Sequence, residues 1–147
     1  MTFLAFCGEI RQMKKKFITT NPNQTQKLGG MLAKELKGGK IICLEGELGS
    51  GKTTFTQGLL KSLGVRGPCT SPTFVIMKMY KDSIFHFDAY RVRDKDILNL
   101  GWEELIADKN NIIIVEWADR IQKIIPKRAL RIKFKWLGEN KRKISIK

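Results

Sequence analysis

The chain has 147 residues, of which 42% are hydrophobic, and it carries a formal net charge of +14. This length is enough for one well-buried globular domain and short for two. No apolar run reaches the 18 or more residues of a membrane-spanning helix, and the apolar opening Phe3–Phe6 precedes its basic cluster, unlike a secretory signal. The sequence therefore predicts no membrane anchor, and the charge favours acidic or polyanionic partners such as nucleic acid.

The cysteines give an expectation about the compartment. Cys7, Cys43 and Cys69 are odd in number, widely spaced and without a histidine at metal-ligand spacing. This pattern argues against disulfides and against a zinc site. We therefore expect a reducing, cytoplasmic location.

The first predicted elements are a helix and a strand. Leucine and methionine recur at three- and four-residue steps between residues 23 and 37, which predicts an amphipathic helix closed by Gly38–Gly39. The short apolar run Ile41–Leu44 follows, as is typical of a buried parallel strand.

A phosphate-binding motif comes next. Gly46–Thr53 reads Gly-Glu-Leu-Gly-Ser-Gly-Lys-Thr and matches G-x-x-x-x-G-K-[ST] between that strand and a helix over Thr54–Lys61. Glycines let backbone N–H groups turn around an anion, and the helix N-terminus adds further donors and a partial positive charge. The pattern predicts that Lys52 reaches the β- and γ-phosphates of a nucleotide and that the Thr53 hydroxyl ligates Mg²⁺. The alternative is an ordinary Gly-rich turn with a solvated lysine.

The rest of the chain continues the alternation of strands and helices. The expected elements are a loop over residues 64–72, strands at 74–80 and 84–87, a helix over 95–107, a strand at 111–116 and extended segments at the end. This order around a phosphate loop predicts an α/β fold of three layers, a P-loop NTPase with a central mixed, largely parallel sheet flanked by helices.

Glu116 is the second chemical signal. It follows four consecutive β-branched apolar residues, Ile112–Val115, so its side chain emerges at the carboxyl end of a central strand. Nucleotide-binding sheets hold Mg²⁺ or its coordinated water at this edge, and Glu116 with Thr53 supplies the hard oxygen ligands that this ion prefers. The alternative is that Glu116 only ends the strand.

Basic residues are densest at Lys14–Lys16 and over residues 127–143. In Arg131–Trp136 the charges alternate with apolar residues. This pattern fits an amphipathic strand with one solvated face, and it also fits a surface that faces nucleic acid.

Further motifs extend the pattern. Gly46–Thr54, Ser71–Phe74, Tyr80, His86–Arg91 and Glu116–Trp117 occur in the order and spacing of the TsaE (YjeE) ATPases, and the resemblance spans about residues 18–145. The chain thus resembles a family that acts in bacterial biosynthesis of the tRNA modification threonylcarbamoyladenosine. The resemblance implies ATP and Mg²⁺ as cofactors, hydrolysis that is weak without partner proteins, and a nucleotide-driven switch on the TsaD–TsaB complex. That complex would supply the contact with tRNA.

The resemblance also implies site residues. Lys52, Asp88 and Glu116 would act in hydrolysis, with Thr53 and Glu116 at Mg²⁺ and with Asp88 as base or orienter of the attacking water. The alternative for Asp88 is a strand-end carboxylate paired with an arginine, Arg91 or Arg93. The implied nucleotide-binding set is Leu48, Gly49, Ser50, Gly51, Lys52, Thr53 and Thr54, with Thr25 on the adenine side and Arg142 near the nucleotide.

Three residues are candidates for switching or partner contact. Thr73 lies in a segment that looks like a switch loop sensing the γ-phosphate. Tyr80 and Trp117 are candidate contacts, and packing is the alternative for Trp117. His86 is expected to be structural, because nothing near it supplies a nucleophile to activate.

Two departures from the family pattern are modest: Glu47 replaces an aspartate, and Ala89 replaces a leucine. We expect residues 1–16 to be an N-terminal extension and residues 17–147 to be a single P-loop ATPase domain. Met13 precedes a segment like an ordinary family N-terminus, so we expect translation to begin there.

Two other function classes use features of this chain. A small-molecule kinase shares the phosphate loop but usually needs a basic lid, and no separate lid segment of convincing length is found. A direct RNA-binding protein would exploit the +14 charge. No guanine-reading Asn/Thr-Lys-x-Asp segment is present, which argues against a GTPase.

Overall fold

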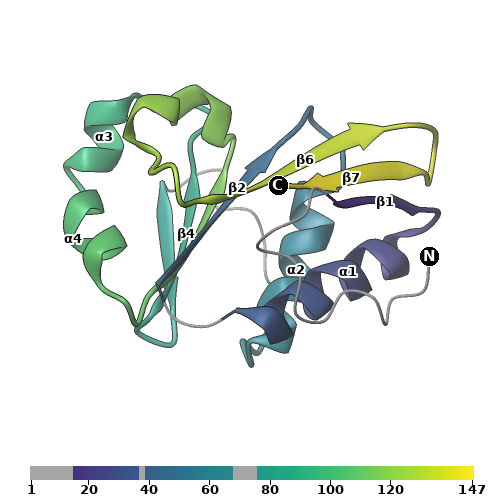
Figure 1. The fold of residues 1–147 in the computed structure, drawn as a ribbon, viewed down its shortest axis with the longest axis horizontal. Helices are drawn as coiled ribbons and strands as arrows, with labels where there is room; N and C mark the ends of the chain where they lie inside the picture. The colour runs from purple at the N-terminus through teal and green to yellow at the C-terminus, as the bar shows by residue number, and fades with distance from the viewer. Residues whose placement is uncertain (1–14, 37–38, 68–75) are drawn as a thin grey trace. The chain divides into compact units, whose positions relative to one another are not determined.

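The computed structural model describes residues 15–36, 39–67 and 76–147 (Figure 1). These residues form two compact units. We call residues 15–36, 46–67 and 132–147 the phosphate-loop unit, and residues 39–45 and 76–131 the parallel-sheet unit.

The phosphate-loop unit contains an antiparallel sheet and two helices. Its elements are β1 (Lys15–Thr19), α1 (Pro22–Glu35), α2 (Lys52–Ser62), most of β6 (Leu130–Trp136) and β7 (Arg142–Ile146). The sheet has the order β1–β7–β6, and Phe17, Ile144 and Phe134 lie opposite one another across it. The Phe55 ring on α2 meets the Phe134 ring edge-on at 5.3 Å, so the apolar face of the sheet packs toward the helices.

The two helices of this unit pack closely side by side (Figure 1). Asn21 caps α1 by accepting a hydrogen bond from the Gln24 N–H at 2.9 Å, and Pro22 follows in the first turn, where it needs no backbone donor. The close approach depends on Gly58 of α2, because an added Cβ would lie 2.0 Å from the Gln26 carbonyl oxygen.

The parallel-sheet unit contains four strands and short helices. Its elements are β2 (Lys40–Glu45), β3 (Met77–Tyr80), β4 (Ile84–Asp88), α3 (Asp94–Leu98), α4 (Trp102–Ala107), β5 (Ile112–Glu116) and a 3-10 helix, η2 (Ala118–Ile124). Strands β2, β5 and β4 are parallel in that order, and β3 joins β4 antiparallel. One face of the sheet forms a hydrophobic core with α3, α4 and η2, in which Phe87 meets Trp102 edge-on at 5.3 Å. The predicted α/β fold class with a mixed, largely parallel sheet flanked by helices is confirmed.

Most predicted elements agree with the observed bounds to within a few residues, but the single helix over 95–107 is wrong. Two short helices, α3 and α4, replace it. The chain turns at Asn99–Leu100, and Gly101 then adopts φ of +84°, which a continuous helix cannot contain. Strand β1 and helix η2 were not predicted. The predicted strand over 74–80 is observed from Met77, and residues 74–75 lie outside the described part.

The described elements also bear on the predictions about membranes and cysteines. Among the helices in the described ranges, none combines the length and the apolar character that crossing a bilayer requires. Cys43 of β2 is a buried free thiol, whereas Cys7 and Cys69 lie outside the described ranges.

Candidate nucleotide site

The phosphate loop follows β2 in the chain and ends in the first turn of α2. Three of its glycines have positive φ: 155° at Gly46, 78° at Gly49 and 108° at Gly51. Side chains disfavour these conformations. At Gly46 an added Cβ would also lie 2.7 Å from both the Phe134 carbonyl oxygen and the Ser50 Oγ. The loop therefore requires glycine for its conformation and for its close packing.

Lys52 is the first residue of α2 and is only 6% exposed. Its Nζ donates hydrogen bonds to the carbonyl oxygen of Gly46 and, at 2.8 Å, to that of Glu47. Ser50 Oγ lies 3.5 Å from the same nitrogen. A buried ammonium thus lies at the start of a helix, where backbone N–H groups and the helix dipole already favour anions. The arrangement is suited to binding phosphate.

The other residues of the predicted loop set differ in exposure. Leu48 is 87% exposed, and Gly49 and Thr53 are also exposed. Ser50 is buried and its N–H donates to the Glu47 carbonyl oxygen at 3.1 Å, so it stabilises the turn itself. Thr53, one residue after Lys52, has an exposed hydroxyl-bearing side chain. Thr54 is half-buried.

Thr25 and Arg142 lie beside the phosphate loop. A Cβ added to Gly51 would lie 3.7 Å from Thr25 Cγ2 and 3.6 Å from Arg142 Cγ. Thr25 is buried, and its hydroxyl lies 2.8 Å from that of Thr19. The Arg142 guanidinium turns toward the β6–β7 connection, where its Nη1 donates to the Gly138 carbonyl oxygen at 2.7 Å. The fold thus brings two residues far apart in sequence to the same loop.

Asp88 and Glu116 end two neighbouring parallel strands of the other unit. The β4–β5 register places them directly opposite each other, and they are 8% and 2% exposed. The Asp88 Oδ1 accepts a hydrogen bond from the Tyr90 N–H at 2.9 Å. The Ala89 N–H donates to the Glu116 carbonyl oxygen at 3.0 Å. Two largely buried acidic residues thus meet at the carboxyl ends of neighbouring strands.

The sequence of this chain matches one protein family over most of its length. The family model described as threonylcarbamoyl adenosine biosynthesis protein TsaE matches residues 19–144. The chain belongs to the TsaE family. The matched range contains both the phosphate loop and the two strand-end carboxylates.

Individual TsaE proteins agree with this assignment. The tRNA threonylcarbamoyladenosine biosynthesis protein TsaE of Bacillus subtilis (strain 168) is 38% identical over 134 residues, covering 89% of this chain and 84% of the relative. The protein of the same name from Aquifex aeolicus (strain VF5) is 37% identical over 140 residues, covering 92% and 97%. A crystal structure of Bacillus subtilis YdiB matches with a TM-score of 0.77 at 33% identity, covering 91% of this chain and 84% of that chain. The predicted resemblance to TsaE is confirmed.

Thr53 and Glu116 can each be compared with the ligands that Mg²⁺, the metal implied by the TsaE resemblance, prefers. Within the described ranges, no three His, Cys, Asp or Glu side chains gather into a metal-binding cluster. Mg²⁺ does not need such a cluster, because it is usually held by one or two carboxylates together with substrate phosphates and waters. The oxygen ligands of Thr53 and Glu116 are of the type that this ion prefers.

His86 lies beside this candidate metal ligand, which sequence reasoning did not anticipate. It is 2% exposed, and its Nε2 lies 3.4 Å from Glu116 Oε2. Among the described residues neither ring nitrogen has a partner with hydrogen-bond geometry, so His86 and Glu116 lie close together without a hydrogen bond between them. A signal for this position was present in the sequence, because side chains alternate along a strand and His86 and Asp88 therefore share one face of β4.

Trp117 belongs to an aromatic cluster directly after Glu116. It has φ of 60° and ψ of 39°, a left-handed conformation that is uncommon for a bulky residue. Its ring lies 4.8 Å from that of Tyr90, and the Arg120 guanidinium lies 4.8 Å from the Tyr90 ring and 5.5 Å from the Trp117 ring. Trp117 also packs against the core, while Tyr90 is 38% exposed. Sequence reasoning did not single out Tyr90 or Arg120.

The other two switch candidates are less defined. Tyr80 ends β3, is half-buried and lies opposite Ile84 of β4. Thr73 lies outside the described residues.

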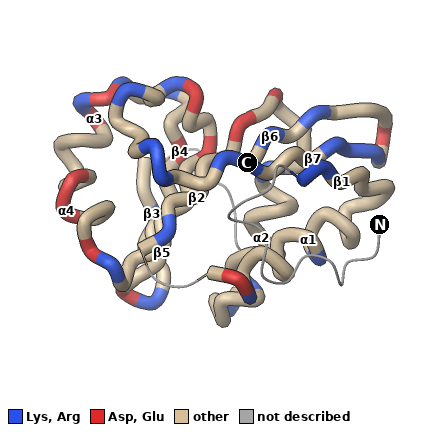
Figure 2. The backbone as a smooth tube through the Cα atoms, viewed as in Figure 1, with Lys and Arg blue, Asp and Glu red and all other residues tan. Residues whose placement is uncertain are grey.

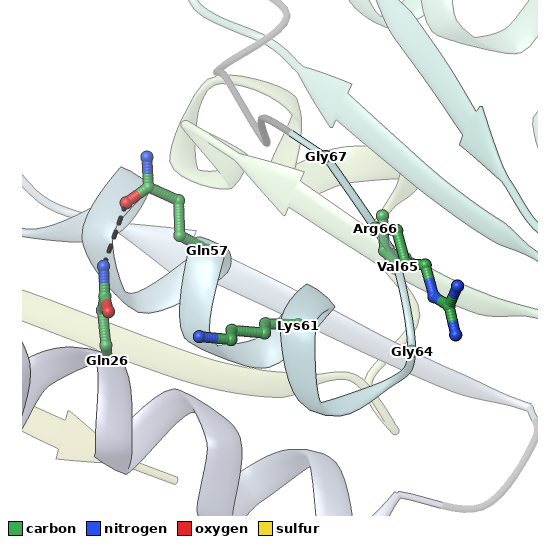
Figure 3. Close-up of a pocket in the computed structure, with 7 residues that line it drawn as sticks. All are labelled: Gln26, Gln57, Lys61, Gly64, Val65, Arg66 and Gly67. Carbon is green, nitrogen blue, oxygen red and sulfur yellow. Dashed lines mark hydrogen bonds between the residues drawn. The ribbon is translucent and has the colours of Figure 1, made fainter.

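A polar pocket of about 610 Å³ lies in the phosphate-loop unit but does not include the loop. Gln26, Gln57, Lys61 and the segment Gly64–Gly67 line it, and the Gln26 Nε2 donates to the Gln57 Oε1 at 3.3 Å. In Figure 3 the Lys61 side chain extends toward Gln26, whereas that of Arg66 points away. The two cations therefore do not converge on one ligand.

Proposed function

We propose that this chain binds and hydrolyses Mg-ATP and acts as a nucleotide-driven switch on a TsaD–TsaB complex that adds threonylcarbamoyl to tRNA adenosine. The observation that carries the proposal is the buried Lys52 in a glycine-rich loop of a TsaE-family chain. The shared name of the relatives, which refers to tRNA threonylcarbamoyladenosine biosynthesis, supports the process. We place this activity in the cytoplasm.

The phosphate-loop residues have the binding role in this proposal. The Lys52 Nζ, which donates to the Gly46 and Glu47 carbonyl oxygens, would bind the β- and γ-phosphates, and the N–H groups at the start of α2 would donate to the same phosphates. Thr25 and Arg142 lie beside Gly51, and they would contact the rest of the nucleotide. The proposed binding set is Leu48, Gly49, Ser50, Gly51, Lys52, Thr53, Thr54, Thr25 and Arg142.

The strand-end carboxylates and Thr53 have the catalytic role. Thr53 and Glu116 would hold Mg²⁺, which would supply positive charge to neutralise the phosphates. Asp88 would act on the attacking water as base or orienter, and the hydrogen bond from the Tyr90 N–H fixes the direction of its carboxylate. Burial of Asp88 and Glu116 strengthens both interactions, because few waters compete for their oxygens.

The switch requires that the partner complex bind one nucleotide state better than the others. We propose that Thr73 senses the γ-phosphate and that Tyr80 and Trp117 contact the partner. Trp117 follows Glu116 directly in the chain. A movement of the Glu116 backbone on metal binding would therefore also move Trp117.

A reconstituted system with purified TsaD, TsaB and unmodified tRNA tests the ATPase. We expect Lys52→Ala, Asp88→Ala and Glu116→Ala each to abolish most ATP turnover and threonylcarbamoyladenosine formation. Lys61→Ala, Asp119→Ala and Glu103→Ala remove the same residue types at exposed positions and serve as matched controls. Unchanged tRNA modification in folded site variants would contradict the proposal.

A binding measurement tests the switch separately. The affinity of the chain for the TsaD–TsaB complex is measured with ATP, with ADP and without nucleotide. We expect the ATP form to bind at least about tenfold more tightly, a difference of about 1.4 kcal/mol. Equal affinity in the three states would contradict the proposed switch but not the proposed ATP hydrolysis.

A further inference from the structure

Lysines gather on the outer face of the antiparallel sheet in the phosphate-loop unit. The inner face holds the buried Phe134 and Ile144, so the alternate residues of each strand face outward. Within this unit the outward residues are Lys16 and Ile18 on β1, Lys143 and Ser145 on β7, and Lys133 and Lys135 on β6. The preceding alternate residue of β6, Arg131, belongs to the parallel-sheet unit and pairs there with Glu45 at 3.1 Å. Figure 2 shows basic residues along these strands. We call Lys16, Lys133, Lys135 and Lys143 the lysine face.

The strand register sets the spacing of these side chains. Lys135 lies directly opposite Lys143, and Ser145 lies between Lys16 and Lys133. Neighbouring strands are about 4.8 Å apart, and alternate residues of one strand are about 7 Å apart. The attachment points of the four ammonium groups therefore fall within a patch roughly 10 Å across.

No carboxylate offsets this charge on the face itself. The six outward residues include no Asp or Glu, and none of the four lysines forms an ion pair with another residue in the described part of the chain. Like charges directly opposite each other in an antiparallel pair destabilise it by about 0.2–1 kcal/mol. The Lys135–Lys143 pair therefore costs stability.

Two general reasons for surface lysines account for only part of this pattern. A solvated face needs polar residues, but these can carry either sign of charge. Lysine on an edge strand prevents unwanted strand pairing. That reason does not apply to Lys143, because β7 is hydrogen-bonded on both sides, to β1 and to β6. A ligand of opposite charge accounts for the whole face.

We propose that the lysine face binds the phosphate backbone of tRNA directly. This goes beyond the nucleotide switch, in which tRNA is reached only through partner proteins. The relatives are named for a tRNA modification, so tRNA is the polyanion that this chain would meet. Flexible lysines on a flat sheet suit an irregular run of phosphates, because ammonium groups act as point charges without a required geometry.

Salt-dependent binding of an unmodified tRNA transcript to the full chain, without partner proteins or nucleotide, tests the proposal. The face variant combines Lys133→Glu, Lys135→Glu and Lys143→Glu. The control combines Lys95→Glu, Lys123→Glu and Lys127→Glu, exposed lysines of the parallel-sheet unit, and lowers the net charge equally. We expect the face variant to bind about tenfold or more weakly, with a salt slope shallower by about 2 units, and the control to stay near wild type.

Three results would overturn the proposal: no tRNA binding by wild type at low salt, equal weakening by both variants, or unchanged binding by the face variant. Equal weakening would mean general attraction to a basic chain. If the glutamate variant folds poorly, the double variant Lys16→Gln, Lys143→Gln takes its place. It removes charge without adding any, and it should also weaken tRNA binding. ATP affinity measured on the same samples separates the two proposals, because it should remain at the wild-type value when tRNA binding is lost.

Discussion

The parallel strands β2, β5 and β4 and the antiparallel strands β1, β7 and β6 differ in burial and in where they carry charge. Strands β2, β4 and β5 of the parallel-sheet unit are buried on both faces, so their acidic side chains Asp88 and Glu116 occur at the strand ends. The β1–β7–β6 sheet is open on one face and carries lysines along its length. Parallel sheets are generally covered on both faces, whereas antiparallel sheets tolerate solvent on one.

This difference separates two kinds of polar recognition. In the parallel-sheet unit the carboxylates of Asp88 and Glu116 are largely removed from water, where each charge interacts strongly with its surroundings. On the lysine face each charge is solvated and acts weakly, so only the sum is effective. The predictions below test this contrast between buried single groups and exposed collective ones.

The largest expected effect concerns the buried strand β2. Burial raises the pKa of the Cys43 thiol from 9.0 to about 12, with Arg131 opposing the shift. At neutral pH its thiolate fraction is therefore about a thousandfold lower than that of an ordinary thiol. We expect Cys43 alkylation by iodoacetamide to be slower by about this factor in the folded protein than in urea, as read by peptide mass spectrometry. Equal rates would mean that the strand is not buried in solution.

The same shift predicts the sign of a pH effect on stability. The folded state holds the Cys43 proton more tightly than the unfolded chain, so this contribution is complete below pH 9.0 and is lost as pH rises toward about 12. Urea denaturation across that window should show less loss of stability for Cys43→Ala than for wild type. The opposite order would contradict the assignment.

The next effect concerns the buried carboxylate at the strand end. If the proposed Mg²⁺ role holds, we expect Glu116→Gln to lower ATP hydrolysis by about 100-fold, close to 3 kcal/mol, because it would remove a charged ligand of the proposed site while keeping the side-chain shape. The Mg²⁺ concentration that gives half-maximal activity should rise as well. Glu103→Gln, an exposed substitution on α4, is the control and should leave both values unchanged.

A further prediction concerns the helix pair of the phosphate-loop unit. Gly58→Ala should destabilise the fold by about 2–3 kcal/mol, because its Cβ would lie 2.0 Å from the Gln26 carbonyl oxygen. Gly30→Ala is a matched helical control. Its Cβ meets only the end of the Ser62 side chain, 2.7 Å away, which can rotate, so the stability should change by less than about 1 kcal/mol. Denaturant unfolding of both variants measures the difference.

The smallest effect concerns the lysine face. Lys143→Glu replaces a repulsive pair with Lys135 by an attractive one. We expect a gain of about 0.2–1 kcal/mol in the free energy of unfolding, which salt reduces. Lys127→Glu, at an exposed position outside the sheet, should give no comparable gain. A loss of stability in Lys143→Glu would mean that the face carries no net repulsion.

Local signals identified much of the fold and of the candidate site. The apolar runs at β2 and β5, the glycine-rich loop between β2 and α2, and the acid at position 116 are each contained in a short stretch of sequence. The helix break at Gly101 was missed, because one glycine inside a helical pattern is compatible with either outcome until the surrounding packing decides. Strand β1 was missed for a related reason: its lysines resemble a disordered basic run until they pair with β7.

The sequence by itself determined the phosphate loop, the alternation of strands and helices and the excess of positive charge, because glycine conformation, hydrophobic period and composition are local properties. Only the tertiary structure decided which distant residues meet. Strand register put Glu116 opposite Asp88 and beside His86, packing brought Thr25 and Arg142 to Gly51, and β1 joined β7 and β6 to collect the lysines on one face. These contacts depend on the pairing of segments separated by tens of residues, which local chemistry does not specify.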